Sequence, residues 1–481
     1  MKLARIGKTK IVCTLGPASS DVPTLIRLIQ GGMDIARLNF SHGTHEEHLA
    51  ALRNVRAASS ETGQAIAVLQ DLQGPKIRIG DLQTPFVELV PGNEVVIATD
   101  GRPGTASRLS TTFVNLPTDV TPNEIILLDD GKIRLRVLAT DGHEVKCTVL
   151  VGGKLAPHKG INLPGVAVSA PSFTDKDLDD LAFGLSNDVD YVALSFVRTA
   201  DDIRQLRREI QARQKNVQTP VGIIAKIEKP QAIDDLGAII AEADGVMVAR
   251  GDLGVELPPE DVPMLQKRII NRCNRAGKPV IVATQMLESM IQNPTPTRAE
   301  TSDVANAVVD GCDAVMLSGE TSVGAYPVEA VGIMNRIIIK VESERSGGRD
   351  ASRVPPATVK EKHNALGRAA CMLADQMEAA AIVTLTHSGE TARVLSRYRP
   401  DPPIIALTLA PKTLRMLNLF WGVRGLVIES LSADSDAALQ QIQERLVKEG
   451  IVRRGDSMVL LAGQPLFARG STNFIKVEHI A

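Results

Sequence analysis

Short runs of aliphatic and β-branched residues recur along the first 320 residues, and each run is closed by polar residues or glycine. Segments with the apolar spacing of an amphipathic helix, such as 200–214, separate these runs. Bounded apolar runs that alternate with helical segments are typical of the buried parallel strands of βαβ units. The runs are KIVCTLG near the start and then the segments 34–41, 65–74, 190–198, 221–228, 244–252, 279–286 and 313–320. These eight strand–helix units predict a (β/α)8 TIM barrel, an α/β fold.

The stretch 75–170, which follows the third run, has a different pattern. Turn signals such as PGNE, TDGRPG, DDGK and VGGK separate short alternating strands such as KIRLRVLA and EVKCTVLV. This pattern predicts a small all-β domain inserted into the barrel. Because the insertion leaves the barrel at the carboxyl end of a strand, where barrel enzymes place their active sites, we expect it to act as a lid.

The last part of the chain is set off by a polar stretch rich in glycine and proline, ESERSGGRDASRVPPATVKE, which predicts a linker. Beyond it, helical segments alternate with the strand-like runs AAIVTLT, PIIALTL, RGLVIE, DSMVLLAG and FIKVEHI. This alternation predicts a separate open α/β domain. The expected domains are therefore the barrel at 1–74 and 171–342, the β-rich lid at 75–170 and the C-terminal α/β domain at 343–481.

Composition and charge exclude several classes of protein. The formal net charge of −2 and the lack of a basic tail argue against a nucleic-acid-binding protein. No apolar run approaches the length of about 20 residues that a membrane helix needs, and the basic start lacks the apolar segment of a signal peptide. The five cysteines are widely spaced and form no C-x-x-C pair, which fits reduced thiols better than disulfides or a zinc site. We therefore expect a cytoplasmic protein that binds neither nucleic acid nor a membrane.

Polar residues close most of the predicted barrel strands, and the carboxyl ends of all strands in a barrel lie on one face. In chain order they are Arg37, Asn39, Ser41, Asp71, Lys226, Glu228, Arg250, Gly251, Asp252, Thr284, Ser318 and Glu320. Such a density of polar strand ends is costly to a fold unless a ligand uses it. We therefore expect a ligand-binding cavity at this face.

Lys226 and Glu228 stand two residues apart in the segment VGIIAKIEKP and would emerge on the same side of a strand. Either they neutralise each other as an ion pair, or both are aimed at a ligand. The carboxylates of Glu228 and Asp252, together with water and substrate oxygens, suit an octahedral Mg²⁺ or Mn²⁺ ion. Arg37 and Lys226 can then hold a phosphoryl group and stabilise charge that develops on oxygen.

A turn in the C-terminal part offers a second candidate site. The segment 383–398, VTLTHSGETARVLSRY, reads as a strand, a turn and a helix. Its turn contains Thr386, Ser388, Gly389 and Thr391. Their hydroxyls and backbone N–H groups at a helix N-terminus could cradle a phosphate, and the alternative is an ordinary helix cap.

Two other motifs have simpler interpretations. The GKT fragment at 7–9 lacks the first glycine of a P-loop, whose place is taken by Lys2. The histidines of HGTHEEH at 42–48 lack the spacing of a helical zinc motif, so we expect a solvated helix start there, with His42 able to reach the cavity.

Taken together, nine segments of the chain resemble the pyruvate kinase family. They are TKIVCTLGPAS, ARLNFSHG, LQDLQGPKIR, KGINLPG, AKIEKPQAI, MVARGDLGVE, VATQMLESM, PTPTRAETSDVANAV and DAVMLSGET. The resemblance covers essentially the whole chain, in order. It implies transfer of the phosphoryl group of phosphoenolpyruvate to ADP, giving pyruvate and ATP, by a magnesium-dependent and usually homotetrameric enzyme. It also implies a C-terminal effector domain, in which we expect the turn with Thr386, Ser388, Gly389 and Thr391 to bind a phosphorylated effector, although the effector's identity stays open.

The resemblance assigns roles to the strand-end residues. Glu228 and Asp252 would be the ligands of Mg²⁺, while Arg37 and Lys226 would clamp the phosphoryl group, with Lys226 also facing the enolate. The backbone N–H groups of Gly251 and Asp252, with the Thr284 hydroxyl, would receive the substrate carboxylate. Thr284 would also belong to a water relay that protonates the enolate. The nucleotide contacts implied are His42, Arg78, Asp130 and Lys159.

The chain departs from the commonest family pattern at the monovalent cation. Many members hold K⁺ with side chains that match Asn39, Ser41 and Asp71 and with the backbone carbonyl that matches Leu72. Members that require K⁺ carry glutamate after the G-P dipeptide and threonine after the aspartate. This chain has Lys76 and Leu72 at those positions. Since a tethered ammonium can supply the charge of K⁺, we expect that K⁺ is not required.

Two alternatives to the kinase stay open at this point. A metal-dependent aldolase or lyase that acts through a pyruvate enolate would use the same acidic residues but no nucleotide. A non-catalytic sugar-phosphate sensor would keep the C-terminal turn without the strand-end residues, and the presence of all of those residues argues strongly against it.

Overall fold

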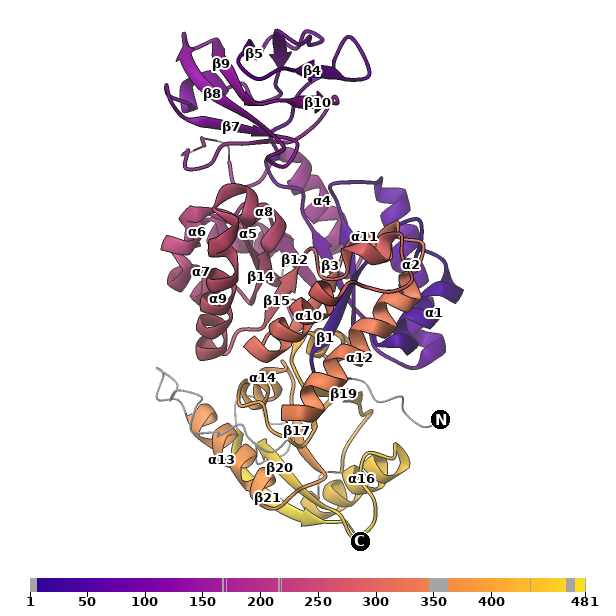
Figure 1. Cartoon of the computed structure of the whole chain (residues 1–481). Coiled ribbons are helices and arrows are strands. Elements are labelled where there is room, and N and C mark those ends of the chain that lie inside the picture. The colour runs from indigo at the N-terminus through magenta and orange to yellow at the C-terminus, as the bar shows by residue number, and fades with distance from the viewer. Residues whose placement is uncertain are drawn as a thin grey trace.

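The computed structural model describes residues 7–345 and 362–480, apart from residues 167, 170, 215, 216, 218, 433 and 464–471. The described chain forms three bodies in a row, with the lid at one end, the barrel in the middle and the C-terminal α/β sheet at the other end (Figure 1). Helix α12 ends at Arg345, and most of the predicted linker lies outside the described residues. The exact domain boundaries stay a prediction.

Eight parallel strands close into a barrel in the order β1-β16-β15-β14-β13-β12-β3-β2, which confirms the predicted fold class. Their bounds are β1 Lys10–Thr14, β2 Ile35–Asn39, β3 Ala67–Asp71, β12 Tyr191–Leu194, β13 Gly222–Ile227, β14 Gly245–Ala249, β15 Val280–Ala283 and β16 Ala314–Leu317. Each lies within the run of residues from which it was predicted. Because all strands run in one direction, their polar ends meet at one face of the barrel.

Helices surround this barrel and connect its strands (Figure 1). They are α1 Val22–Gly31, α2 His45–Thr62, α4 Asp175–Ser186, α5 Ala200–Arg213, α6 Pro230–Asp234, α7 Leu236–Glu242, α8 Arg250–Glu256, α9 Val262–Ala276, α10 Arg298–Asp310, α11 Gly319–Ser322 and α12 Pro327–Arg345, with the 3-10 turns η1 Pro259–Asp261 and η2 Glu288–Ile291. Local sequence sets several of their starts. Thr44 and Glu47 form a capping box at α2, as Thr297 and Glu300 do at α10.

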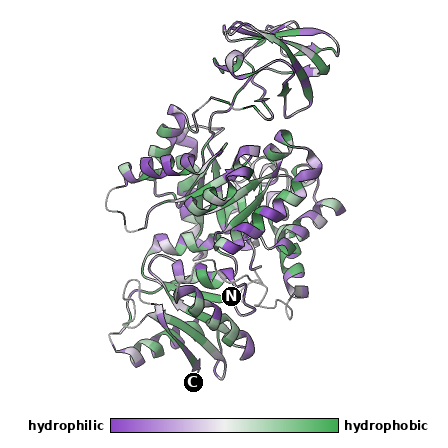
Figure 2. Cartoon of the chain, turned by 90° about the vertical axis from the view of Figure 1, so that its left-hand side faces the viewer, coloured by the Kyte–Doolittle hydropathy of each residue, from purple (hydrophilic) through white to green (hydrophobic). Residues whose placement is uncertain are grey.

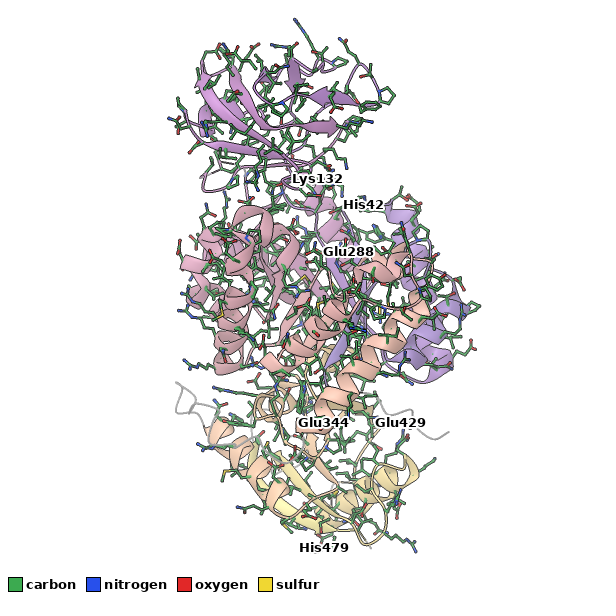
Figure 3. The ribbon with its side chains drawn as sticks, viewed as in Figure 1. His42, Lys132, Glu288, Glu344, Glu429 and His479 are labelled. Atoms are coloured by element: carbon green, nitrogen blue, oxygen red, sulfur yellow. The ribbon has the colours of Figure 1, made fainter. Side chains whose placement is uncertain are left out.

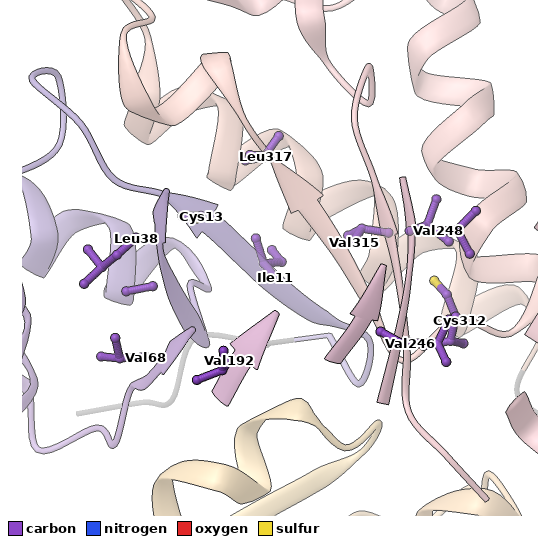
Figure 4. Close-up of a cluster of buried hydrophobic side chains, with 14 of the residues drawn as sticks. Ile11, Cys13, Leu38, Val68, Val192, Val246, Val248, Cys312, Val315 and Leu317 are labelled. Carbon is purple, nitrogen blue, oxygen red and sulfur yellow. The ribbon is translucent and has the colours of Figure 1, made fainter. Parts of the chain in front are cut away.

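The hydrophobic core of the barrel has two layers. Figure 4 shows part of the outer layer, in which strand residues such as Val68, Val192 and Val248 pack among the aliphatic side chains of the helices. The inner layer fills the barrel itself, and Leu419 from the C-terminal part packs into it. Figure 2 shows the same division, since the barrel strands are largely apolar whereas the surrounding helices alternate. The interior of the barrel is therefore filled with apolar side chains, and the candidate polar residues lie at the strand ends.

The lid contains a six-stranded sheet, ordered β11-β7-β8-β9-β5-β6, and a two-stranded sheet, β10-β4. The strands are β4 Val87–Leu89, β5 Glu94–Ala98, β6 Arg108–Ser110, β7 Ile125–Leu128, β8 Ile133–Thr140, β9 Glu144–Val151, β10 Gly153–Leu155 and β11 Ile161–Asn162, with one short helix, α3 Leu116–Asp119. A separate hydrophobic cluster forms its core. The lid faces the carboxyl ends of the barrel strands, where the candidate residues gather (Figure 1).

The C-terminal part forms a five-stranded sheet in the order β19-β18-β17-β20-β21, of which β21 is antiparallel to β20. Its elements are α13 Lys362–Gln376, β17 Ala381–Leu385, α14 Glu390–Arg397, β18 Ile404–Thr408, α15 Pro411–Met416, η4 Leu417–Leu419, β19 Val423–Val427, α16 Ser435–Lys448, β20 Ser457–Gly463 and β21 Thr472–His479.

Buried ion pairs fasten this sheet to the end of the barrel opposite the lid. Arg399 NH1 lies 2.8 Å from Asp313 Oδ1, and Arg415 Nε lies 2.8 Å from Asp190 Oδ1. The two aspartates directly precede β16 and β12. Arginines of the C-terminal part therefore form ion pairs with the barrel at the starts of two strands.

No helix among the described residues is both long and apolar enough to cross a membrane.

Candidate active site

Arg37, at the end of β2, is buried and held from two sides. Its Nε and NH2 both lie 2.7 Å from Asp71 Oδ2 at the end of the neighbouring strand β3. Its NH1 donates to the Thr14 hydroxyl at 2.9 Å from the end of β1. A guanidinium fixed by three strand ends has one orientation, which suits it to bind a planar or tetrahedral anion.

Lys226, in β13, occupies the centre of the predicted site. Its Nζ donates to Ser195 Oγ at 2.7 Å and lies 2.9 Å from Glu228 Oε1 and 3.3 Å from Asp71 Oδ1. Glu228 is 1% exposed, and its Oε2 accepts the backbone N–H of Phe196 at 2.7 Å. The predicted ion pair between Lys226 and Glu228 is therefore present, and the alternative that both are aimed at a ligand stays a prediction.

The buried charges shift one another's pKa values. Burial favours the neutral form of Lys226, yet the carboxylates of Asp71 and Glu228 outweigh it and hold the pKa of this ammonium above its ordinary value. Burial also opposes ionisation of Asp71, but Lys226 and Arg37 keep its pKa below the usual range. Burial raises the pKa of Glu228, and nearby Asp252 adds to the rise against the pull of Lys226. At neutral pH the Lys226 ammonium is therefore charged. A further cation nearby would stabilise the buried carboxylate of Glu228.

Helix α8 begins directly after β14 and brings Gly251 and Asp252 to the site. The backbone N–H of Gly251 donates to Thr284 Oγ1 at 2.8 Å, and that hydroxyl donates to the carbonyl of Ala283 at 2.7 Å. Thr284 has a left-handed φ of 70°, a conformation that is costly for a β-branched residue and is often found at functional sites. Arg250 does not face the cavity as a free cation, since it donates to the carbonyl of Thr284 at 2.6 Å and pairs with Asp303.

Ser318 and Glu320, the two polar residues predicted at the end of β16, differ in their hydrogen bonds. Glu320 is 2% exposed, and its carboxylate accepts the N–H groups of Leu287 and Ser318 at 3.0 and 2.7 Å. Ser318 Oγ is buried and has no hydrogen-bond partner among the described residues. Glu320 therefore fixes the loop that follows β15.

The carboxylates present could hold one divalent cation. Glu228 and Asp252 interact electrostatically, Glu228 directly after β13 and Asp252 in the first turn of α8, which follows the neighbouring strand β14. Within the described part of the chain, no group of three or more His, Cys, Asp or Glu side chains is placed as a metal site. A hard cation with two carboxylate ligands must complete its shell with water or substrate oxygens, which is how Mg²⁺ is often bound. The donor set therefore fits the predicted metal.

A cavity of about 590 Å³ opens beside Arg37, lined by Thr14, Pro17, Asn39, His42 and His48 among others. Figure 3 places His42 at the barrel end that faces the lid. Burial lowers the pKa of His42, and the charges of Arg78, Lys76 and Arg37 lower it further. The structure thus brings lid cations close to a barrel histidine.

The other predicted nucleotide contacts lie on the lid. Arg78 donates to the carbonyl of His158 at 3.0 Å, and Lys159 Nζ lies 2.8 Å from Asp129 Oδ1. Asp130 lines a small cavity between lid and barrel, together with Lys76 and Asp252. The four candidates therefore lie on the lid and on the barrel face beneath it.

Several oxygen atoms that match the K⁺ site already accept hydrogen bonds from the protein. The carbonyl of Leu72 accepts the Ser195 hydroxyl at 2.8 Å, and Asn39 Oδ1 accepts the N–H of Ser41 at 3.2 Å. Asp71 Oδ1 is buried and accepts no hydrogen bond within the described residues. Lys76 is exposed and lines the cavity between lid and barrel.

The C-terminal turn has the predicted strand–turn–helix form between β17 and α14. Thr386 Oγ1 accepts the N–H of Gly389 at 2.9 Å, and Gly389 has a φ of 86°. Thr391 Oγ1 lies 3.1 Å from Thr472 Oγ1, while Ser388 is exposed. The turn is therefore partly closed by its own hydrogen bonds and offers Ser388 to solvent.

Sequence reasoning missed Thr14 and Ser195, which contact Arg37 and Lys226. Both lie at or directly after barrel strands, β1 and β12, so the rule that identified the other strand ends applies to them too. It also missed Asn162, Lys229 and Glu256, which connect lid and barrel. No local signal marks those three, because they meet only when the lid rests on the barrel.

Comparison with known proteins agrees with this geometry. Residues 6–331 match the family model described as pyruvate kinase, barrel domain, and residues 364–478 match pyruvate kinase, alpha/beta domain. The chain is 45% identical over 471 residues to a pyruvate kinase of Mycobacterium tuberculosis, covering 98% of each protein. It is also 45% identical to one of Geobacillus stearothermophilus, covering 98% of this chain and 80% of that protein.

A crystal structure of a pyruvate kinase from Cryptosporidium parvum superimposes with a TM-score of 0.92 and 38% identity, over 99% of this chain and 96% of that chain. Full-length identity at this level, a shared architecture and two matching family models leave one assignment. The chain belongs to the pyruvate kinase family.

Proposed function

We propose that this chain transfers the phosphoryl group of phosphoenolpyruvate to ADP and so forms pyruvate and ATP. The observation that carries the proposal is the placement of Lys226 near the end of β13, where its Nζ lies 2.9 Å from Glu228 Oε1 and 3.3 Å from Asp71 Oδ1. Buried charges in this density cost stability unless a ligand uses them. Membership of the pyruvate kinase family supports the same reaction.

Arg37 and Lys226 bind and orient the transferring phosphoryl group. Asp71 and Thr14 fix the Arg37 guanidinium, so little freedom is lost when substrate binds. Lys226 also faces the enolate oxygen and stabilises its negative charge in the transition state. In-line phosphoryl transfer depends on positioning and charge neutralisation, so no covalent intermediate with the protein is needed.

The N-terminal turn of α8 and Thr284 receive the substrate carboxylate. Gly251 and Asp252 lie in the first turn of α8, where the helix has a partial positive charge, and the carboxylate would take the Gly251 N–H that now donates to Thr284 Oγ1 at 2.8 Å. Thr284 completes this cradle and orients a water molecule that delivers the proton to the enolate carbon. An alcohol is too weak an acid to supply that proton unassisted near pH 7.

Glu228 and Asp252 would hold Mg²⁺ or Mn²⁺. The divalent cation, when bound, neutralises charge on the phosphoryl and enolate oxygens. In its absence, Lys226 keeps Glu228 paired, which lowers the cost of burying that carboxylate.

The nucleotide occupies the space between the barrel and the lid. On the barrel side, a cavity of about 590 Å³ that is lined by barrel residues, His42 among them, has room for a nucleoside. Arg78 and Lys159 on the lid supply positive charge for the diphosphate, and Asp130 is the acidic contact from the same side. Two observations support this arrangement: the charge of Arg78 acts on His42, and Asp130 lines the cavity between lid and barrel.

The remaining parts of the proposal draw on the family resemblance. The enzyme is a cytoplasmic homotetramer with the domain boundaries predicted from sequence. A phosphorylated metabolite binds at Thr386, Ser388, Gly389 and Thr391 and regulates it. Lys76 replaces K⁺, so the family cation site at Asn39, Ser41, Asp71 and Leu72 is not needed for activity.

A coupled assay with phosphoenolpyruvate, ADP and Mg²⁺ tests the central proposal. We expect ATP and pyruvate in equal amounts, and only when ADP is present. Pyruvate release that does not need a nucleotide would instead identify an aldolase or lyase.

The isosteric variants Asp252→Asn and Glu228→Gln test the metal ligands. Each should lower turnover by several orders of magnitude while circular dichroism stays native, because an amide oxygen lacks the charge that binds a hard cation. Near-normal turnover of either variant at saturating Mg²⁺ would reject that ligand. Asp201→Asn, which alters an exposed carboxylate paired with Arg204 on α5, is the control.

A further inference from the structure

The lid touches the barrel at helix α8. Asn162 Nδ2, in lid strand β11, donates to Glu256 Oε1 in the last turn of α8 at 3.0 Å. The lid turn at Gly131 also approaches this helix, since a Cβ added to Gly131 would lie 4.0 Å from Val255 Cγ1. Two separate segments of the lid therefore rest on the C-terminal half of α8.

Glu256 is a buried carboxylate that the proposed chemistry leaves without a role. It is 6% exposed, and its Oε1 also lies 2.5 Å from Lys229 Nζ. A buried carboxylate is costly unless hydrogen bonds and a counter-charge surround it. Lys229 supplies the charge from the barrel, and Asn162 supplies a hydrogen bond from the lid.

The same cluster reaches the proposed metal ligands by two routes. Lys229 directly follows Glu228 in the chain, and its Nζ lies 5.5 Å from the centre of the Phe196 ring. The backbone N–H of Phe196 is the group that holds Glu228 at 2.7 Å. The cluster therefore adjoins the loop that carries Glu228.

The second route runs along α8 itself. Asp252 and Glu256 are four residues apart and so lie on one side of this seven-residue helix. A helix of two turns moves as a unit, because its backbone hydrogen bonds join all of its residues. A contact that fixes Glu256 therefore also fixes Asp252 and Gly251.

We infer that Asn162, Glu256 and Lys229 form a latch through which docking of the lid sets the position of α8. Glu256 is a positioning residue, acting on the substrate cradle through the helix rather than by touching substrate. When the lid lifts, Glu256 loses the Asn162 amide, and α8 loses its contacts with the lid. The inference rests on the proposed function only where it takes Asp252 and Gly251 as the residues that α8 positions.

Two lid variants test the latch. Asn162→Ala removes the lid hydrogen bond and leaves the Lys229–Glu256 pair in place. Asn162→Asp keeps the side-chain size but sets a second carboxylate against Glu256, so it should be the more damaging. We expect kcat/KM for phosphoenolpyruvate to fall about fivefold in the first variant, which loses one hydrogen bond to a charged group, and about fiftyfold in the second, which adds a repulsion, while circular dichroism stays native. Asn93→Ala, an exposed lid residue away from the barrel, is the control.

A double-mutant cycle with Glu256→Gln separates coupling from two independent defects. In the latch, the effects of Asn162→Asp and Glu256→Gln on kcat/KM are not additive, because the neutral amide that replaces the Glu256 carboxylate in the double variant removes the repulsion between the two carboxylates. The double variant should then be more active than the Asn162→Asp single variant. Additive effects would overturn the latch.

Hydrogen exchange gives a readout that does not depend on activity. Amides of α8 should exchange faster in Asn162→Asp than in the unaltered protein, whereas those of α9 should not change. Unchanged exchange in α8 would overturn the inference. If the unaltered chain formed no ATP from phosphoenolpyruvate but α8 responded in this way, the proposed function would fail and the latch would stand.

Discussion

Lys226 and Glu228, two residues apart on β13 and the loop after it, pair at 2.9 Å between Nζ and Oε1. The same ammonium lies 3.3 Å from Asp71 Oδ1, so one cation compensates two buried carboxylates. The proposed catalytic cation and metal ligand therefore neutralise each other before the metal and substrate bind. In the proposed reaction, Lys226 can bind the substrate and can stabilise the charge that develops on the enolate. The effects of one variant on KM and on kcat distinguish these two roles.

Lys226→Met keeps the aliphatic stem and removes the charge. We expect kcat to fall about 10²–10³-fold, because stabilisation of the developing enolate charge is lost, while KM for phosphoenolpyruvate changes much less. Steady-state kinetics at saturating Mg²⁺ measure both constants. A large rise in KM with kcat retained would mean that Lys226 serves binding alone.

The second prediction concerns the ion pair that fastens the C-terminal sheet to the barrel. Asp190 is fully buried, and burial raises its pKa against the pull of Arg415 and Arg56. Arg415→Met would leave that carboxylate with less compensation and should lower the free energy of unfolding by about 3 kcal/mol at pH 8. Lys412→Met, which alters a pair with the exposed carboxylate of Asp188, is the control and should cost less than about 1 kcal/mol.

The loss caused by Arg415→Met should shrink as the pH falls. A carboxyl group whose pKa is raised by folding binds a proton more readily in the folded state than in the unfolded state. Protonation therefore favours the folded form, and stability is lost as the pH rises through the folded pKa. Denaturant unfolding at pH 5 and pH 8 would contradict this account if the variant lost the same free energy at both.

The sequence predicted the barrel because each buried parallel strand is marked by an apolar run with a helix after it. It also predicted that Arg37, Asp71, Lys226 and Asp252 lie at one face, since the strand direction alone brings them there. The role of Glu320 could not be read in this way, because its backbone partner Leu287 lies in another loop. The lid contact of Asn162 with Glu256 depends on how two separately folded parts dock, which no local pattern records.

The C-terminal turn gives the third prediction. Ser388 is exposed between the internally bonded Thr386 and Thr391, so Ser388→Asp would put a negative charge where the proposed phosphate binds. Activation by a phosphorylated metabolite should be lost, while activity at saturating substrate should persist. Ser388→Ala, which adds no charge, should retain part of the activation.

An assay with a panel of sugar phosphates and nucleotides measures this effect. If none of them changes the activity of the unaltered enzyme, the turn is a helix cap and not an effector site.

The last prediction concerns Lys76 and the monovalent cation. Lys76 lines the cavity between lid and barrel that Asp252 also lines, and its charge acts on His42. In our proposal, an ammonium there would supply the positive charge that K⁺ brings in other family members and would repel a second cation. We therefore expect substantial activity in tetramethylammonium buffer and at most mild stimulation by K⁺. The competing expectation is that Asp71, whose buried Oδ1 lies 3.3 Å from Lys226 Nζ, still binds K⁺ together with Asn39 and Ser41.

Lys76→Glu distinguishes these two expectations. The carboxylate would leave the cavity short of positive charge, so activity without K⁺ should fall about tenfold or more and return when K⁺ is added, as expected for the loss of one close charge interaction. Lys154→Glu, a charge reversal on the lid beside Phe86, should leave the response to K⁺ unchanged. If the unaltered enzyme already loses its activity in tetramethylammonium and regains it with K⁺, then Lys76 does not replace the cation, and Asn39, Ser41 and Asp71 keep the role they have in the K⁺-requiring members.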